Sequence, residues 1–222
     1  MEREIITTAD GSKTIQLKDW GEQYHSKHGA VQEAYHVFIK NGLSLFKDQS
    51  VALLEIGFGT GLNALISWIE SENYGLEIQY TGVEAFPVCK EEIQELSYIT
   101  TLEAESYRAG FEKMHGEAWG AEIILSEKFK ILKQKRDFKD INDQNLFDLI
   151  YFDAFGARVQ PELWTEGIFQ KMFKALRNNG ILVTYSAKGS VRRAMQAVGF
   201  NVERLPGPPG KREMLRATKK VL

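Results

Sequence analysis

The chain has 222 residues, of which 43% are hydrophobic and 26% are charged, and its formal net charge at pH 7 is −2. This length suits one domain with a substantial hydrophobic core, and the composition is that of an ordinary soluble globular protein. The small net charge argues against a protein that coats nucleic acid over its whole surface, although it is compatible with a local basic patch.

Two further features of the composition bear on location. No apolar run approaches the roughly 18 residues that a membrane span requires, and the first residues lack the apolar core of a secretory signal. The single cysteine, Cys89, excludes an internal disulfide and fits a reducing compartment. We therefore expect a cytoplasmic protein.

The first 50 residues are predicted to form an extension of a domain that spans residues 51–222. Residues 4–18 alternate weakly around Asp10-Gly11, which indicates a small β-hairpin. Residues 30–46 place apolar side chains at helical spacing and predict a helix.

From residue 51 onward, short apolar runs alternate with amphipathic stretches. Strands are predicted at residues 51–56, 77–83, 129–135, 146–152 and 181–185. Helices are predicted at residues 62–70, 87–96, 101–115, 161–176 and 190–198. Two β segments, 200–204 and 213–218, finish the chain with no helix between them, so one late strand must be antiparallel. The pattern predicts an α/β fold with a mostly parallel sheet covered on both faces.

A glycine-rich turn, Gly57-Phe58-Gly59-Thr60-Gly61, connects the first strand of this domain to its first helix. Glycine permits positive φ and lets a ligand approach backbone N–H groups at the positive end of a helix. Nucleotides, dinucleotides and S-adenosylmethionine all bind such turns. The spacing of Gly59, Gly61 and Ala64 also fits the dinucleotide fingerprint, so the turn alone does not identify the ligand.

Two carboxylates discriminate between these ligands. Glu55, two residues before Gly57, would repel a pyrophosphate but suits the ammonium or sulfonium of S-adenosylmethionine. Glu84 ends the second strand, where an acid can accept both ribose hydroxyls of either an adenosine-type methyl donor or NAD. The alternative for each is a solvated charge at a strand end.

Two more acids follow later strands. Asp137 comes after the third strand, where it could hold an adenine amine or lie at the surface. Asp153 follows a buried strand and should face the same crevice as the glycines, because sites in open α/β sheets lie beyond the carboxyl ends of the strands. Its alternative role is a helix cap.

Basic residues concentrate near the end of the chain: Lys188, Arg192, Arg193, Arg204, Lys211, Arg212, Arg216, Lys219 and Lys220. Such a run is usually a solvated face. Here Arg192-Arg193 should open a helix and Lys211-Arg212 should lie in a Pro/Gly loop, both near the carboxyl edge of the sheet, which favours a phosphate-binding surface. The histidines form no metal-site pattern, and neither a nucleophile elbow nor a Walker lysine occurs.

Several separated motifs together resemble the methyltransferase domain of bacterial MnmC proteins. They are the turn from Glu55 to Asn63, "VEAFP" (83–87), "FDLIYFDAFGARVQPELWT" (147–165), "VRRAMQAVGF" (191–200) and "GKREML" (210–215). Residues 24–38, which contain Glu33, resemble the segment that precedes the glycine turn in that family.

The resemblance implies a Rossmann-like class I methyltransferase with a seven-stranded sheet and one antiparallel strand near the C-terminus. It implies methyl transfer from S-adenosyl-L-methionine to the exocyclic amine of 5-aminomethyluridine, often 2-thiolated, at the tRNA wobble position. Many relatives carry a fused flavin-dependent oxidase, and we expect this chain to be the stand-alone form.

The resemblance also suggests roles for individual residues. We expect the cofactor to be bound by Glu33, Glu55, Gly57, Phe58, Gly59, Thr60, Gly61, Asn63, Glu84, Asp137 and Asp153. Asp153 would orient the amine and Phe155 would stack on the uracil or wall the pocket. We expect contacts with the anticodon region of the RNA from Arg158, Arg192, Arg193, Lys211 and Arg212. We expect no metal and no membrane.

Three alternatives remain open at this point. A methyltransferase for a small amine or other metabolite, or a polyamine-type aminopropyl transferase, would share the sheet and the acid near Asp153 without needing the basic cluster. An NAD-dependent oxidoreductase is disfavoured by Glu55. A catalytically idle adenosine-nucleotide or RNA-binding module would have no reason to keep Asp153 beside Phe155.

Overall fold

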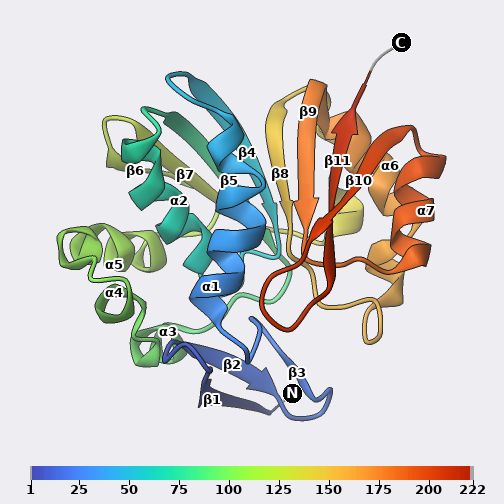
Figure 1. Ribbon diagram of the computed structural model, residues 1–222. Coiled ribbons are helices and arrows are strands. Elements are labelled where there is room, and N and C mark those ends of the chain that lie inside the picture. Colours follow the sequence, from blue (N-terminus) through green and yellow to red (C-terminus); the bar gives the residue numbers. More distant parts are fainter. Residues whose placement is uncertain (1, 221–222) are drawn as a thin grey trace.

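The computed structural model describes residues 2–220, and within them the strands form two sheets (Figure 1). From one edge to the other, the main sheet contains eight strands in this described part of the chain: β10 (Phe200–Pro206), β11 (Glu213–Lys219), β9 (Leu176–Thr184), β8 (Phe147–Phe152), β4 (Ser50–Ile56), β5 (Glu77–Glu84), β7 (Phe129–Lys135) and β6 (Glu122–Ser126). The small sheet contains β1 (Arg3–Thr7), β2 (Lys13–Leu17) and β3 (Glu22–Gln23).

Strand directions in the main sheet confirm the predicted α/β fold. β9, β8, β4, β5 and β7 are parallel, and β11 is antiparallel to β9, as expected for the strand near the C-terminus. The predicted number of seven strands is one too low, because β6 pairs antiparallel with β7 at the far edge. β6 is short, and its central Ile124 is 55% exposed, so its sequence lacks the buried pattern of the other strands.

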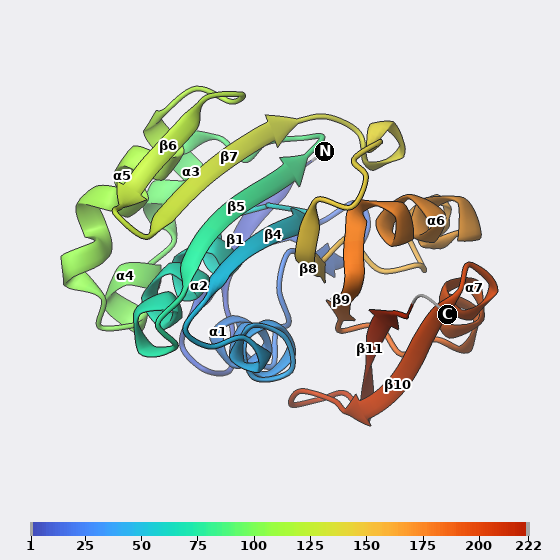
Figure 2. The same ribbon diagram turned by 90° about the horizontal axis from the view of Figure 1, so that it is seen from above.

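Helices cover both faces of the main sheet, as the view along the sheet shows (Figure 2). α1 (Ala30–Ala34), α2 (Leu62–Asn73), α4 (Tyr98–Thr101) and α5 (Arg108–Gly116) contribute to one hydrophobic core; α6 (Glu166–Ala175) and α7 (Gly189–Ala197) contribute to the other. Neighbouring residues of β4 alternate between them, since Leu53 belongs to the first core and Leu54 to the second. Both faces of β4 are therefore buried, as expected for a strand in the interior of a sheet that is covered on both sides.

Several predicted helices are shorter or more irregular than expected. The helix predicted at residues 30–46 consists of α1, a π-helical stretch (Tyr35–Lys40) and a 3-10 turn (Leu43–Leu45). α3 (Lys90–Glu95) begins after Pro87, because the Cys89 N–H donates to the Glu92 carboxylate at 3.1 Å.

The other departures lie at helix boundaries. Residues 101–115 contain the end of α4, a 3-10 turn (Glu105–Tyr107) and α5, and residues 161–176 contain a 3-10 turn (Pro161–Trp164) and α6. A further 3-10 turn spans Phe138–Asp140. Residues 176–180, expected to end a helix, belong to β9.

The small N-terminal sheet lies beyond the carboxyl ends of the parallel strands, at the bottom of Figure 1. β1 and β2 form the predicted hairpin, and β3 is an additional strand that pairs with β2. Arg3 forms an ion pair with Glu92 at 2.8 Å, and Lys13 Nζ donates to the Glu95 carbonyl at 3.1 Å. These contacts fix the small sheet to α3. In residues 2–220, no helix is both long and apolar enough to span a bilayer.

The contact between α5 and α2 provides a test of the packing. A Cβ atom at Gly110 would lie 2.2 Å from Cη2 of Trp68, whose indole packs edge-on against Tyr107 with ring centroids 4.7 Å apart. We expect Gly110→Ala to lower the free energy of unfolding by about 1–3 kcal/mol, because overpacking exceeds the gain in helix propensity. Urea unfolding measures this change.

Gly116→Ala is the matched control, since it lies in the same helix and its added Cβ would meet no atom within 4 Å. We expect that variant to be at least as stable as the wild type. Equal stability of Gly110→Ala and Gly116→Ala would show that α5 does not pack against Trp68 as described.

Candidate active site

A cavity of about 940 Å³ lies between the carboxyl ends of the parallel strands and the small N-terminal sheet. Its walls include residues of the N-terminal region that contains the small sheet and residues that follow the parallel strands of the main sheet. Of the residues predicted to bind the cofactor, substrate or RNA, those that line it are Glu33, Gly57, Gly59, Glu84, Asp137, Asp153, Phe155, Arg158 and Lys211.

The glycine turn brings the backbone close to its neighbours, as the sequence suggested. Gly57 has φ +89°, and a Cβ there would lie 2.6 Å from the Asp153 carbonyl oxygen. Gly59 has φ +51°, and a Cβ there would lie 3.0 Å from the ring of Tyr24. Any larger residue at Gly57 would push the turn away from β8 and open the site.

Three members of the turn face away from the cavity. The Phe58 ring packs against Gly82 of β5, and a Cβ atom added to Gly82 would lie 2.4 Å from that ring. Thr60 is fully buried, and its hydroxyl lies 2.9 Å from both His25 Nε2 and the Tyr98 hydroxyl. Gly61 packs against His115. These residues support the turn from behind.

Glu84 and Asp137 line the cavity at the ends of neighbouring strands. The Glu84 carboxylate accepts hydrogen bonds from the Gly59 N–H at 3.1 Å and the Phe86 N–H at 2.9 Å. Asp137 accepts from the Lys139 N–H at 3.0 Å, and this hydrogen bond lowers the pKa of its carboxyl group. Each carboxylate is therefore oriented by backbone groups.

Glu55 lies behind the cavity wall, where it has no exposed surface. It accepts hydrogen bonds from the Tyr80 hydroxyl at 2.7 Å and from Asn63 Nδ2 at 2.9 Å. Burial raises the pKa of its carboxyl group well above the ordinary value, while these two hydrogen bonds oppose that shift. Direct contact with a ligand, as the sequence suggested, would require Glu55 to leave these partners.

Asn63 connects Glu55 to Asp153. Its Nδ2 also donates to Asp153 Oδ2 at 2.9 Å, so one amide group serves two carboxyl groups. Its Oδ1 is buried and has no hydrogen-bond partner among residues 2–220. A buried acceptor without a partner is energetically unfavourable unless a ligand or water supplies a donor.

Asp153 follows β8 and lines the cavity. Burial, with a smaller contribution from the nearby charge of Glu33, raises the pKa of its carboxyl group to about 7. The hydrogen bond from Asn63 and the charge of Lys211 act in the opposite direction. Asp153 is thus a carboxyl group that exchanges a proton near neutral pH.

Glu33 and Lys211 form an ion pair inside the cavity. Lys211 Nζ donates to Glu33 Oε1, while Glu33 Oε2 accepts from the Ser26 N–H at 3.0 Å. Lys211 Nζ also lies 3.9 Å from the centroid of the Tyr185 ring. The structure therefore places Lys211 beside the proposed reaction site, whereas the sequence suggested a phosphate contact.

Aromatic side chains from the N-terminal region surround Phe155. Its ring makes edge-on contacts with Tyr24 (centroids 5.0 Å apart) and Trp20 (5.8 Å apart). The Trp164 indole N–H donates to the Phe155 carbonyl at 2.8 Å and holds the backbone in place. Together these contacts make Phe155 a fixed wall of the cavity.

Sequence reasoning missed Trp20, Tyr24, His25 and Tyr185, all of which line the cavity. Their signal was weak, because the first three lie in an irregular segment whose position depends on the docking of the small sheet. Burial lowers the pKa of His25 to about 4, so this imidazole is neutral at pH 7. Neutral His25 can form its hydrogen bond with Thr60 without bringing a charge to the site.

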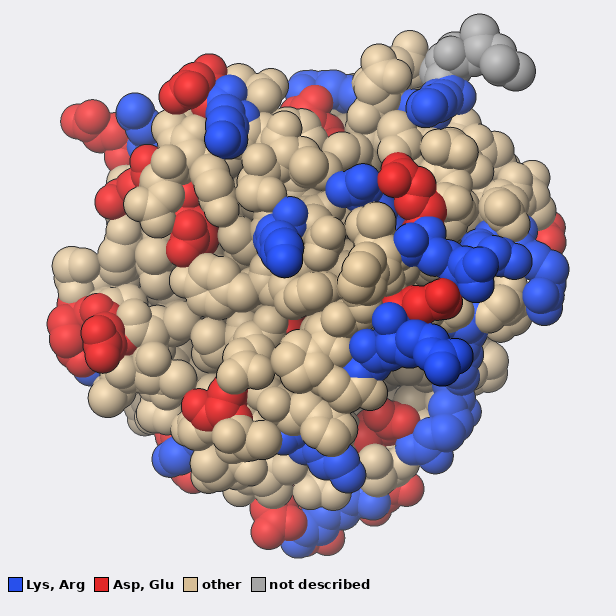
Figure 3. Space-filling model, viewed as in Figure 1, with Lys and Arg blue, Asp and Glu red and all other residues tan. Residues whose placement is uncertain are grey.

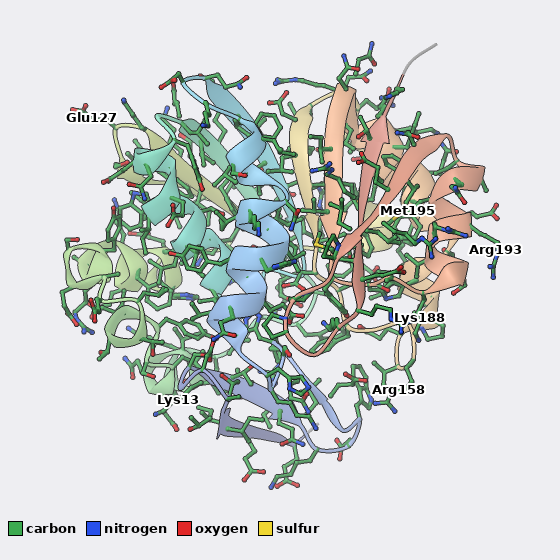
Figure 4. All side chains as sticks on the ribbon, viewed as in Figure 1. Lys13, Glu127, Arg158, Lys188, Arg193 and Met195 are labelled. Atoms are coloured by element: carbon green, nitrogen blue, oxygen red, sulfur yellow. The ribbon has the colours of Figure 1, made fainter. Side chains whose placement is uncertain are left out.

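The predicted RNA contacts differ in position. Arg158 lies at the cavity mouth and pairs with Glu22 at 2.6 Å, while Arg193 and Arg212 are exposed. Lys and Arg side chains gather on the right of the face in Figure 3, and Figure 4 shows Arg158, Lys188 and Arg193 on that side. Arg192 is half-buried, and its Nε has no partner among the described residues.

Two features of the cavity fit S-adenosylmethionine, namely its exposed glycine backbone and its acceptor groups. The positive-φ glycines leave a bare backbone that side chains would obstruct. The carboxyl groups that line the cavity, among them Glu84, Asp137 and Asp153, supply acceptors for hydroxyl and ammonium groups. In residues 2–220, no group of three or more His, Cys, Asp or Glu side chains could hold a metal ion.

Comparison with known proteins gives matches of two kinds. Residues 109–220 match a family described as S-adenosyl-L-methionine-dependent methyltransferase. The chain is also similar to the tRNA 5-methylaminomethyl-2-thiouridine biosynthesis bifunctional protein MnmC of Idiomarina loihiensis, with 30% identity over 86% of this chain and 34% of the relative. The protein of the same name from Actinobacillus pleuropneumoniae serotype 5b is 28% identical over 95% of this chain and 34% of its own length.

Solved structures share the fold of this chain. MNMC2 from Aquifex aeolicus has a TM-score of 0.79 and 26% identity, covering 100% of this chain and 71% of that one. Spermidine synthase from Thermotoga maritima has a TM-score of 0.60 at 14% identity, which is a likeness of fold alone. The chain spans about a third of the length of the curated relatives it matches.

These matches confirm the resemblance to MnmC proteins and the Rossmann-like methyltransferase fold that the sequence predicted. The matched family covers half of the chain, including β8, which precedes Asp153, and the basic C-terminal region. The protein belongs to the S-adenosyl-L-methionine-dependent methyltransferase family.

Proposed function

We propose that this chain transfers a methyl group from S-adenosyl-L-methionine to the exocyclic amine of 5-aminomethyluridine, with or without a 2-thio group, at the wobble position of tRNA in the cytoplasm. The observation that carries the proposal is Asp153, a carboxyl group with a pKa near neutrality beside the aromatic wall of a cavity lined by acids. The names of the MnmC relatives point to the same modified nucleoside.

Specific residues would hold the methyl donor. The Glu84 carboxylate would accept the ribose hydroxyls, Asp137 would accept the adenine amine, and the backbone at Gly57 and Gly59 would lie against the methionine portion. When bound, S-adenosylmethionine supplies an electrophilic methyl group for in-line displacement. The chain itself must therefore exclude water and align a neutral amine with its lone pair free.

Asp153 would provide this alignment and handle the proton. A protonated amine cannot attack, and burial in the cavity lowers its pKa, whereas the nearby carboxylates raise it. Above about pH 7, Asp153 is ionised and can accept a hydrogen bond or a proton from the amine. Asn63 keeps the Asp153 carboxyl group oriented, and Phe155 would stack on the uracil ring.

The exposed cations would bind the phosphates of the anticodon region. A wobble base lies in a single-stranded loop, so presenting it to the cavity requires little unstacking. Mass spectrometry of tRNA nucleosides from cells with and without this gene tests the whole proposal. Loss of the methylaminomethyl nucleoside, with accumulation of its aminomethyl precursor, is the expected result; unchanged nucleosides would refute it.

Cofactor binding depends on Glu84. We expect Glu84→Ala to weaken the binding of S-adenosylmethionine or its demethylated product by about 1–3 kcal/mol, because polar groups in the site lose their partners. Isothermal titration calorimetry measures the affinity. Glu77→Ala, at the other end of β5 and exposed, should bind like the wild type. Tight NAD binding without a response to S-adenosylmethionine would rule out the assignment.

Chemistry at Asp153 should depend on pH. The carboxylate is the active form, so single-turnover methylation at saturating cofactor should rise as pH increases through about 7. We expect Asp153→Asn to lower the rate by roughly 10²–10⁴ and to remove that pH step, since the amide cannot accept the proton. Cofactor affinity should change far less. A rate within about threefold of the wild type (~0.65 kcal/mol) would exclude Asp153 from the mechanism.

Binding of tRNA should depend on the exposed arginines. Neither Arg193 nor Arg212 forms an ion pair within residues 2–220, so both guanidinium groups can contact phosphates. We expect Arg193→Ala combined with Arg212→Ala to weaken tRNA association, and to reduce the slope of log affinity against log salt by about 2. Fluorescence anisotropy over a salt series measures both.

Arg177→Ala is the matched control for that pair. Arg177 is exposed at the start of β9, at the amino ends of the parallel strands and away from the cavity, and it pairs with Asp148 at 2.8 Å. We expect its removal to leave tRNA affinity unchanged. If the double variant also binds like the wild type, the basic surface is only a solvated face.

A further inference from the structure

Lys211 reaches the cavity from the loop between β10 and β11. The loop is folded back on itself, since the Lys211 N–H donates to the Pro208 carbonyl at 2.9 Å and the Gly207 N–H donates to the Arg212 carbonyl at 3.1 Å. His36 Nε2 lies 2.8 Å from the Pro206 carbonyl and fixes the start of the loop to the helical segment that follows α1. The ammonium group therefore projects inward from an anchored support.

The groups around Lys211 Nζ form a small cation-binding environment. Glu33, whose side chain is 11% exposed, provides a carboxylate, and the Tyr185 ring provides an aromatic face 3.9 Å away. Both are held independently of Lys211: Glu33 by the Ser26 N–H, and Tyr185 by its hydroxyl, which donates to the Ala154 carbonyl at 2.8 Å. A carboxylate and an aromatic face are the two groups that bind alkylammonium ions most effectively.

This environment lies next to Asp153. Ala154, which holds Tyr185, directly follows Asp153, and both Glu33 and Lys211 act electrostatically on the Asp153 carboxyl group. An alkylammonium ion bound between Glu33 and Tyr185 would therefore be close to the group that is proposed to orient the reacting amine.

We propose that Glu33 and Tyr185 form the subsite for the aminomethyl group of the substrate, and that Lys211 Nζ occupies this subsite until the substrate amine displaces it. The ligand class is a primary alkylammonium ion, which becomes the neutral attacking amine when it gives a proton to Asp153. The inference rests on the proposed function in taking the substrate to be a primary amine. In this proposal, Glu33 binds the substrate rather than the cofactor. Lys211 fills the subsite before the substrate binds, and it does not contact an RNA phosphate.

A simple amine provides a direct test. Removing the Lys211 ammonium leaves Glu33 as a largely buried carboxylate without its cation, which an external ammonium ion can replace. We expect Lys211→Met to bind methylammonium at least tenfold more tightly than the wild type in calorimetric titrations. Adding Glu33→Gln to Lys211→Met should abolish this gain. Arg204→Met, at an exposed position of β10, should bind methylammonium like the wild type.

A labelling experiment on the wild type covers the case in which Lys211→Met does not fold. If the substrate amine displaces Lys211, an anticodon stem-loop that contains 5-aminomethyluridine should increase acetylation of Lys211, measured by peptide mass spectrometry. The same stem-loop with unmodified uridine should not. Protection of Lys211 by both stem-loops would indicate a phosphate contact and overturn the proposal, as would folded Lys211→Met that binds methylammonium no better than the wild type.

Failure of the proposed function can be distinguished from failure of the amine subsite. If tRNA from cells lacking this gene keeps its methylaminomethyl nucleoside while Lys211→Met gains methylammonium binding that requires Glu33, the amine subsite stands and the substrate is another primary amine. If tRNA methylation depends on this gene and methylammonium binding is unchanged, only the subsite is refuted.

Discussion

The carboxyl group of Glu55 lies at the end of β4, has no access to water, and is held by the Tyr80 hydroxyl and the Asn63 amide. A buried carboxyl group is destabilising unless such partners are in place, so these contacts constrain β4, β5 and α2 together. Because the same Asn63 amide donates to Asp153, the constraint extends to β8. One buried hydrogen-bond chain thus sets the relative positions of the glycine turn and the acid proposed to orient the substrate.

The N-terminal sheet completes a site that the main sheet alone leaves open. Trp20 and Tyr24 pack against Phe155, and His25 contacts Thr60 in the glycine turn. The neutral state of His25 matters here, because a positive charge close to Glu33 would weaken the attraction of this carboxylate for the proposed substrate ammonium ion. The small sheet therefore contributes the apolar wall, while the strand ends contribute the acids.

The strands of the main sheet, apart from β6, and the position of the crevice were predictable from the sequence, because apolar runs and the glycine turn are local signals. The placement of Glu84 and Asp153 in one cavity follows from a parallel sheet, because the carboxyl ends of its strands lie at the same edge. β6 was missed because its exposed Ile124 breaks the buried pattern. The role of Lys211 was also not predictable, since a basic residue in a Pro/Gly loop gives no sign of whether the loop folds outward or into the cavity.

Under the proposed function, the distribution of charge would give the phosphates and the modified base of the RNA different environments. Exposed arginines such as Arg193 attract phosphates over distances limited by the roughly 8 Å screening length of physiological salt. Inside the cavity, Glu33 and Asp153 repel phosphates and attract an amine at short range, where screening is weak. Under the proposed function, an RNA held at the rim would therefore be kept out of the cavity except for a base that carries a positive substituent. Selection of an aminomethylated base over an unmodified one would then follow from electrostatics before any base edge is read.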